Sequence, residues 1–129
     1  MNKKRLLKLA DFLETVPRKR FDLSMWQTQE ATKPEGKKLG ECGFAGCAMG
    51  WAAHEKLFRG LSLSYGELVY KDQEGWAGIA DLFGISFDDW GAEGDAEYLF
   101  MGTNYIGNAT PKQVAKRIRK FVKDGGRPE

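Results

Sequence analysis

The chain has 129 residues with a formal net charge of +2, and 42% of its residues are hydrophobic. This length fits a single domain, residues 1–129, that buries a core without metals or disulfides. Its four Trp, eight Phe and four Tyr exclude disorder of the whole chain, and no apolar run reaches the roughly 18–20 residues of a membrane helix.

The first third of the chain is predicted to contain a helix, a strand and a polar loop. Apolar side chains at helical spacing predict a helix over residues 3–16, which Pro17 ends. Alternating apolar and polar residues predict a strand over 21–25. The polar stretch 27–40 contains one Pro and two Gly, so we expect a mobile loop there.

A second helix is predicted over residues 44–58, closed by Gly60. Its first half is rich in Ala and Gly, although glycine inside a helix costs about 1 kcal/mol relative to alanine. Such small side chains indicate that a neighbour approaches the helix closely. That neighbour is either another element, which would make this a buried central helix, or a ligand.

Short strands and two further helices are expected next in the chain. Residues 61–72 have the pattern of one or two short strands or an irregular hairpin. A helix is predicted over 75–84, with its apolar residues on one side. The stretch 85–109 is rich in Gly and aromatic residues, and a short helix is expected near 95–100.

The last helix has the most complete start and stop signals in the sequence. Thr110 is expected to cap it, Pro111 to occupy its first position, and Gln113 to complete a capping box. Gly125 supplies the stop. Together these elements predict an α+β fold, a single compact domain with four or five helices around a small antiparallel sheet.

Charge is distributed unevenly along the chain. Residues 1–60 carry 12 Lys and Arg against 7 Asp and Glu, whereas residues 61–129 carry 8 against 11. Within the second half, the segment 112–123 has six bases and no acid. A basic helix of this kind is able to meet phosphates. The interpretation adopted is a solvated helix face with cations near its favourable end, so nucleic acid is not an expected partner.

Two cysteines and one histidine limit the metal and redox chemistry. Cys42 and Cys47 are spaced C-x4-C, which is not a zinc-finger spacing, and on one helix Cys47 and His54 would lie about 10 Å apart along the axis. We therefore expect no metal and no cofactor. Nothing requires an oxidising compartment. The basic N-terminus is typical of a signal peptide, but Asp11 and Glu14 interrupt the apolar stretch and no small-residue cleavage site follows, so a cytoplasmic protein is expected.

The start of the second helix is the expected binding site. If that helix begins at residue 43, the amide groups of Gly43, Phe44 and Ala45 lack intrahelical acceptors. They are then able to bind a phosphate group. Cations, stacking aromatic rings and loop amides would complete a nucleotide-like site. These further residues are Arg18, Arg20, Trp26, Trp90, Asn104, Tyr105 and Asn108. The alternative is structural, because Trp is mostly found in cores and loop Asn usually serves turns.

Cys42 stands just before the same helix, where the helix dipole would lower the pKa of its thiol. The string E-C-G-F-A-G-C-A-M resembles the bacteriocin-processing and papain-like cysteine peptidases, which carry Cys-Gly at the opening of a helix. That resemblance implies a nucleophilic Cys42, which needs a histidine within hydrogen-bond reach. His54 would lie about 18 Å away along an unbroken helix, so a hydrolase is expected only if the helix breaks at Gly50.

A wider set of motifs covers most of the chain. These are R-F-D-x-x-x-W at Arg20–Trp26, C-G-x-x-x-C-x-x-G-W-A at Cys42–Ala52, G-W-x-x-I-A-x-L-F-G-I at Gly75–Ile85, Y-L-F at Tyr98–Phe100 and T-P-x-Q-V-A-x-R-I at Thr110–Ile118. In this order they resemble a set of small proteins of phages and bacteria. The resemblance implies a phage setting, in which proteins of this size block host defence by sequestering a nucleotide signal or covering a defence protein.

Three functional hypotheses follow. The leading one is a non-enzymatic, phage-type binding protein that sequesters a small anionic, nucleotide-like ligand. The alternatives are a protein-binding inhibitor of a host defence or regulatory protein, and a cysteine hydrolase that uses Cys42. The expected partner is a small anionic ligand or a host protein, with no membrane, and self-association stays open.

Overall fold

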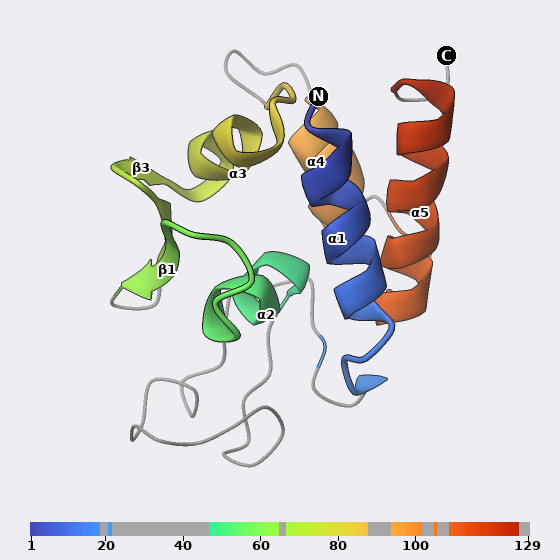
Figure 1. The fold of residues 1–129 in the computed structure, drawn as a ribbon, viewed down its shortest axis with the longest axis horizontal. Coiled ribbons are helices and arrows are strands. Elements are labelled where there is room, and N and C mark those ends of the chain that lie inside the picture. Colours follow the sequence, from blue (N-terminus) through green and yellow to red (C-terminus); the bar gives the residue numbers. More distant parts are fainter. Residues whose placement is uncertain are drawn as a thin grey trace.

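The structure is a computed structural model, and it describes residues 1–18, 21, 47–64, 67–87, 94–101, 105 and 109–126. Within these ranges the chain forms five helices and one three-stranded antiparallel sheet (Figure 1). The arrangement is one small α+β domain. This confirms the predicted fold class.

Helices α1 (Lys3–Leu13) and α5 (Pro111–Asp124) lie side by side and run in opposite directions (Figure 1). Each buries one apolar stripe, as helical periodicity requires. The buried side chains are Leu6, Leu9, Ala10 and Leu13 of α1, and Pro111, Val114, Ala115, Ile118, Phe121 and Val122 of α5. Arg119 adds ion pairs across the two helices, at 3.0 Å to Asp11 and 3.7 Å to Glu14.

The capping signals of α5 are confirmed in full. The Thr110 hydroxyl accepts from the Gln113 amide at 3.1 Å, and the Gln113 side chain accepts from the Thr110 amide at 2.8 Å. Pro111 is at the start of the helix, and Gly125 ends it with a left-handed backbone (φ 76°). Each of these signals acts on the backbone within a few residues of its own position, so the sequence alone was sufficient to predict them.

Helix α2 (Ala48–His54) is a buried central helix, but it is shorter than the predicted 44–58. It begins at residue 48 because Cys47 has an extended backbone and its sulfur accepts from the Gly50 amide at 3.3 Å. It ends at residue 54 because Lys56 takes a left-handed backbone (φ 54°). Side-chain capping at one end and a backbone reversal at the other therefore override the helical pattern of the sequence.

The sheet is a meander of β1 (Leu61–Ser64), β2 (Glu67–Tyr70) and β3 (Gln73–Glu74), in that order. In the first pair, Leu61 lies opposite Tyr70. The predicted hairpin over 61–72 is confirmed. Buried Leu68 and Tyr70 alternate with more exposed neighbours, as a sheet with one face on the core requires.

Helix α3 (Gly75–Phe83) packs on β2 through a close backbone approach, and it confirms the helix predicted over 75–84. Gly78 makes this approach possible. A Cβ atom at position 78 would lie 2.7 Å from the carbonyl oxygen of Gln73 and 3.2 Å from Cβ of Tyr70. The absence of a side chain at this position therefore sets the distance between the helix and the sheet.

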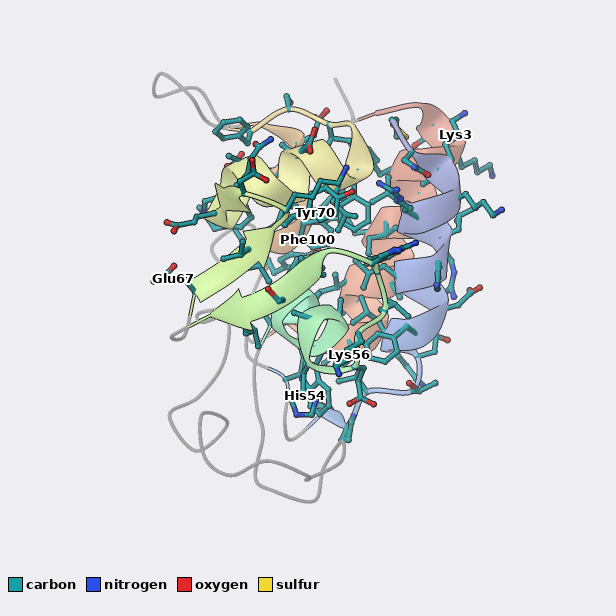
Figure 2. The ribbon with its side chains drawn as sticks, turned by 60° about the vertical axis from the view of Figure 1, so that its left-hand side comes forward. Lys3, His54, Lys56, Glu67, Tyr70 and Phe100 are labelled. Atoms are coloured by element: carbon teal, nitrogen blue, oxygen red, sulfur yellow. The ribbon has the colours of Figure 1, made fainter. Side chains whose placement is uncertain are left out.

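Helix α4 (Asp95–Phe100) completes the core behind α1 (Figure 1), at the position expected for the short helix. Its buried Glu97 accepts a hydrogen bond from the Gly94 amide at 3.1 Å, which satisfies one unpaired amide at the helix start. Four large aromatic side chains from four different helices fill the centre: Trp51, Phe83, Phe100 and Phe121. Figure 2 shows Tyr70 and Phe100 directed into the molecule, whereas Lys3 and Glu67 extend from its edges.

Two predictions near the N-terminus have mixed outcomes. The helix predicted over 3–16 ends at residue 13, because both the amide and the hydroxyl of Thr15 bond the Phe12 carbonyl and close the chain into a turn. Of the strand predicted over 21–25, only Phe21 belongs to the described residues, where it is buried in a β-bridge. The predicted loop 27–40 lies outside the described residues.

Candidate functional site

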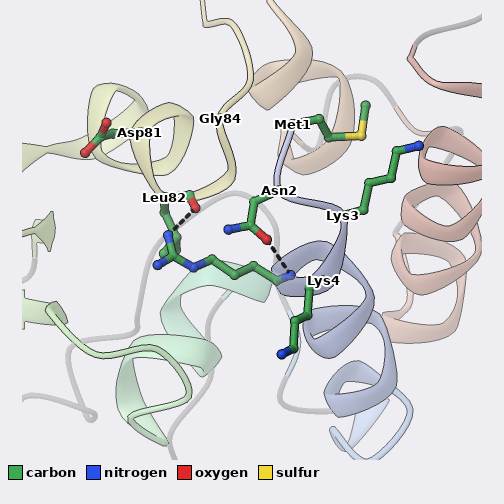
Figure 3. A pocket seen from close by; sticks show the side chains of 8 residues that line it. Met1, Asn2, Lys3, Lys4, Asp81, Leu82 and Gly84 are labelled. Carbon is green, nitrogen blue, oxygen red and sulfur yellow. Dashed lines mark hydrogen bonds between the residues drawn. The ribbon is translucent and has the colours of Figure 1, made fainter.

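An open hollow of about 610 Å³ lies where α1 begins and α3 ends (Figure 3). We call it the α1–α3 hollow. It is lined by Met1, Asn2, Lys3, Lys4, Arg5, Asp81, Leu82 and Gly84. These residues come from two segments that are about 80 positions apart in the chain, so only the fold brings them together.

Two hydrogen bonds hold the start of α1 against the end of α3, and a third reaches β2. The Asn2 amide donates to the Phe83 carbonyl at 2.6 Å, and the Arg5 guanidinium donates to the Leu82 carbonyl at 2.8 Å. Arg5 also donates to the Tyr70 hydroxyl at 3.4 Å. The carbonyls at the negative end of α3 therefore meet donors from the positive end of α1, which favours this docking electrostatically.

Asn2 forms the N-cap of α1, and its side-chain oxygen accepts from the Arg5 amide at 3.0 Å (Figure 3). The amides of Lys3 and Lys4 precede that bonded amide and have no acceptor in the part of the chain that the structure describes. Unpaired amides at a helix start carry the positive end of the helix dipole. The wall of the hollow therefore offers two hydrogen-bond donors to an anion.

The side chains around the α1–α3 hollow are mostly cationic. Lys3 and Lys4 are exposed. Arg5 is half-buried, and its guanidinium donates a hydrogen bond to the carbonyl of Leu82. Asp81 is the one acid among the lining residues. Since Arg5 is already engaged, Lys3 and Lys4 are the cations that remain for a ligand. The lining contains no Cys, His or Ser, and its cations and unpaired amides are suited to binding an anion.

Most of the binding site that the sequence predicted lies outside the residues that the structure describes. Arg18 and Tyr105 are the two members of that set within the described residues. The others lie outside them: Arg20, Trp26, Gly43, Phe44, Ala45, Trp90, Asn104 and Asn108. Arg18 is exposed beyond the end of α1, and the 11 residues of that helix put about 16 Å between it and the α1–α3 hollow.

Tyr105, expected to stack on a base, is instead engaged within the protein. The Arg117 guanidinium lies 3.8 Å from the centre of its ring and 4.6 Å from that of Tyr98. The Tyr105 hydroxyl donates to the Leu99 carbonyl at 2.6 Å. Burial raises the pKa of Tyr105 well above its usual range, and nearby Arg117 offsets only part of that rise. These contacts give Tyr105 a packing role between α4 and α5.

The expected helix start at residue 43 is wrong, because α2 begins at Ala48 after an extended Cys47. The first turn of α2 is buried, and its Gly50 amide is already bonded to the sulfur of Cys47. The predicted phosphate-binding site at residues 43–45 depended on a helix that began there. It does not transfer to α2, which is short and enclosed.

The helix expected to follow Cys42 directly is α2, which begins at Ala48. Cys42 lies outside the described residues, and the thiol at the start of α2 is the buried Cys47. The helix does not break at Gly50, and His54 is at its far end, with Nδ1 2.9 Å from the Glu55 carboxylate. Across the described residues, no group of three or more His, Cys, Asp and Glu side chains is placed to hold a metal.

The comparisons with known proteins give no independent assignment. No protein-family model matches the chain, and no curated protein or solved structure matches it. Among the helices of the described ranges, none is long and apolar enough to cross a membrane. A functional assignment therefore depends on the chemistry of the sites themselves.

Sequence reasoning missed the α1–α3 hollow for a definable reason. Asn2 followed by Lys3 and Lys4 is a readable signal, since Asn is a preferred N-cap residue and cations there line a helix start. The docking of α3 against that start was not readable, because it depends on the tertiary contact between Asn2 and Phe83.

Proposed function

We propose that this protein is a non-enzymatic binding protein that captures a small anionic ligand of the nucleotide class in the α1–α3 hollow. One observation supports this most directly. The amides of Lys3 and Lys4, without acceptors among the described residues, lie at the wall of an open hollow whose side chains are mainly cationic. A phosphate group accepts hydrogen bonds from such amides and is attracted by the helix dipole.

The dimensions of the hollow are compatible with this ligand class. Ligand pockets commonly occupy roughly 300–1,000 Å³, and the α1–α3 hollow of about 610 Å³ lies inside that range. Its openness to solvent favours a polar, charged ligand over an apolar one, because an apolar ligand gains little when it stays wet. The resemblance to small phage and bacterial proteins suggests a context for such capture, the sequestration of a nucleotide signal in the host cytoplasm.

The described surface favours this ligand over the two alternatives. A protein-binding inhibitor typically relies on aromatic or apolar anchors, and the exposed large apolar residues in the described ranges are Met1 and Leu7. A hydrolase needs a nucleophile beside a base, and the lining of the hollow has neither Cys nor His.

The test is binding of nucleotides to the intact chain and to a charge-reversed variant. A panel of nucleoside mono-, di- and triphosphates and cyclic dinucleotides is screened by thermal shift. At 100 times its Kd, a ligand that binds only the native state adds about 2.7 kcal/mol, which raises the Tm by about 8 °C for a domain of this size. Lys4→Glu is then expected to weaken the best nucleotide at least about tenfold by calorimetry, a loss of about 1.4 kcal/mol.

Lys56→Glu is the matched control, because it makes the same charge change at an exposed position far from Lys3 and the hollow (Figure 2). It is expected to bind the nucleotide as the unchanged chain does. If no member of the panel raises the Tm, or if both variants weaken binding equally, the proposed site is wrong.

A further inference from the structure

The outward side of α5 carries a row of lysines that neither the hollow nor the core uses. Lys112, Lys116, Lys120 and Lys123 recur at steps of four and three residues, so they share one side of the helix, and all four are exposed. We call this row the lysine stripe. From Lys112 to Lys123 the stripe covers 12 residues, or about 17 Å along the helix axis.

Few acids neutralise the lysine stripe. Lys120 pairs with Asp124 at 3.1 Å, while the acids of the neighbouring α1, Asp11 and Glu14, pair with Arg119. Lys112, Lys116 and Lys123 have no ion pair within the part of the chain that the structure describes. At least three positive charges thus remain in a line for an external partner.

We infer that the lysine stripe binds the phosphate backbone of duplex nucleic acid without sequence preference. A duplex presents one phosphate per 3.4 Å of axis on each strand, and the strands wind around that axis, so a straight row of about 17 Å meets the few phosphates on the side that it faces. The bases of residues 112–123 were interpreted from the sequence as a solvated helix face, so no nucleic-acid partner was predicted. The structure changes the argument, because it aligns the lysines on one exposed side and places the α1 acids on Arg119 instead of on the stripe.

The composition of this face distinguishes the duplex from other polyanions. None of the exposed residues of α5 is aromatic, so the stripe offers no platform on which unpaired bases would stack. Leu7 is the exposed large apolar residue of α1, which is too little to anchor a protein partner or to insert into a lipid surface. The closely spaced phosphates of a rigid duplex are the ligand that these lysines fit.

The experiment measures fluorescence anisotropy of a labelled 20-base-pair DNA duplex with the full chain, at salt concentrations from 50 to 200 mM. The expected result is a Kd in the micromolar range at low salt that is independent of base sequence. The slope of log K against log salt is expected to be about −3, since three lysines lack an acid partner. Lys112→Glu/Lys116→Glu/Lys123→Glu is expected to weaken binding at least about tenfold and to remove most of that slope.

The control Lys56→Glu/Arg59→Glu/Lys71→Glu changes the net charge by the same amount on exposed residues outside α1 and α5, and is expected to keep the slope. If the Glu variant of the stripe fails to fold, Lys112→Gln/Lys116→Gln/Lys123→Gln replaces it and is expected to weaken binding in the same direction. The inference is overturned if the duplex does not bind, or if both triple variants weaken binding equally. It is also overturned if anionic phosphatidylserine vesicles or a single-stranded 20-mer bind more tightly than the duplex.

Discussion

Truncation of Trp51 to alanine is expected to lower the free energy of unfolding by about 4 kcal/mol. Trp51 lies on the central helix α2 and is fully buried among the core side chains. Removing a buried Trp side chain forfeits its transfer free energy and leaves a cavity, which together cost roughly 3–5 kcal/mol. That loss is a large fraction of the roughly 5–15 kcal/mol that stabilises a typical domain.

Urea unfolding followed by circular dichroism measures this loss. Trp51→Phe is the control, because it keeps a buried aromatic ring and leaves a smaller cavity, so it should cost less than Trp51→Ala. Trp76→Ala offers a second comparison, since Trp76 is half-buried at the start of α3 and its truncation should cost less than that of Trp51. A Trp51→Ala variant as stable as Trp76→Ala would show that α2 is not the centre of the core.

Gly94→Ala is expected to destabilise the protein by about 3 kcal/mol. A Cβ atom at position 94 would lie 2.5 Å from the carbonyl carbon and 2.6 Å from the nitrogen of Phe87, and these main-chain atoms cannot rotate away. The start of α4 is held there by the bond from the Ala96 amide to the Ser86 carbonyl at 2.8 Å, so relief of the clash breaks that contact. Overpacking of this kind costs roughly 1–3 kcal/mol and sometimes more.

Gly125→Ala separates the clash from the ordinary cost of losing a glycine. Gly125 has a positive φ of 76° and nothing within 4 Å of an added Cβ atom, so its substitution should cost only about 1 kcal/mol. Denaturant unfolding of both variants gives the comparison. Equal losses for Gly94→Ala and Gly125→Ala would mean that residues 87 and 94 do not approach as closely as the structure has them.

The elements that sequence reasoning predicted well are those whose signals are local. Helix α5 has its cap, its first-turn proline and its terminal glycine within its own length, and all of them act as expected. The hairpin over 61–72 and helix α3 likewise follow from their own patterns. In each of these cases local propensity and tertiary packing favour the same structure.

Helix α2 shows where local signals are insufficient. Its small residues and apolar pattern continue past both observed ends, so the sequence predicted 44–58 where the structure has Ala48–His54. A sulfur that accepts from the Gly50 amide and a left-handed Lys56 set the bounds. Cys47 is not among the strongly preferred capping residues, and a positive φ at lysine is not encoded by any motif.

The candidate site at the start of α1 is a different site from the one that the sequence predicted. The predicted site at residues 43–45 lies outside the described residues, and the start of α1 was not proposed as a site from the sequence. The difference arises because a hollow is a property of two elements. The start of α1 becomes a site only where Asn2 and Arg5 dock on the last carbonyls of α3, some 80 residues away.

Backbone amide shifts in a two-dimensional ¹H–¹⁵N spectrum, recorded while the nucleotide that most raises the Tm is added, test the proposed capture most directly. The prediction is that the Lys3 and Lys4 amide signals move first and furthest, together with that of Gly84 across the hollow, and saturate with one ligand per chain. Shifts that leave the start of α1 unchanged while signals elsewhere move would contradict the account.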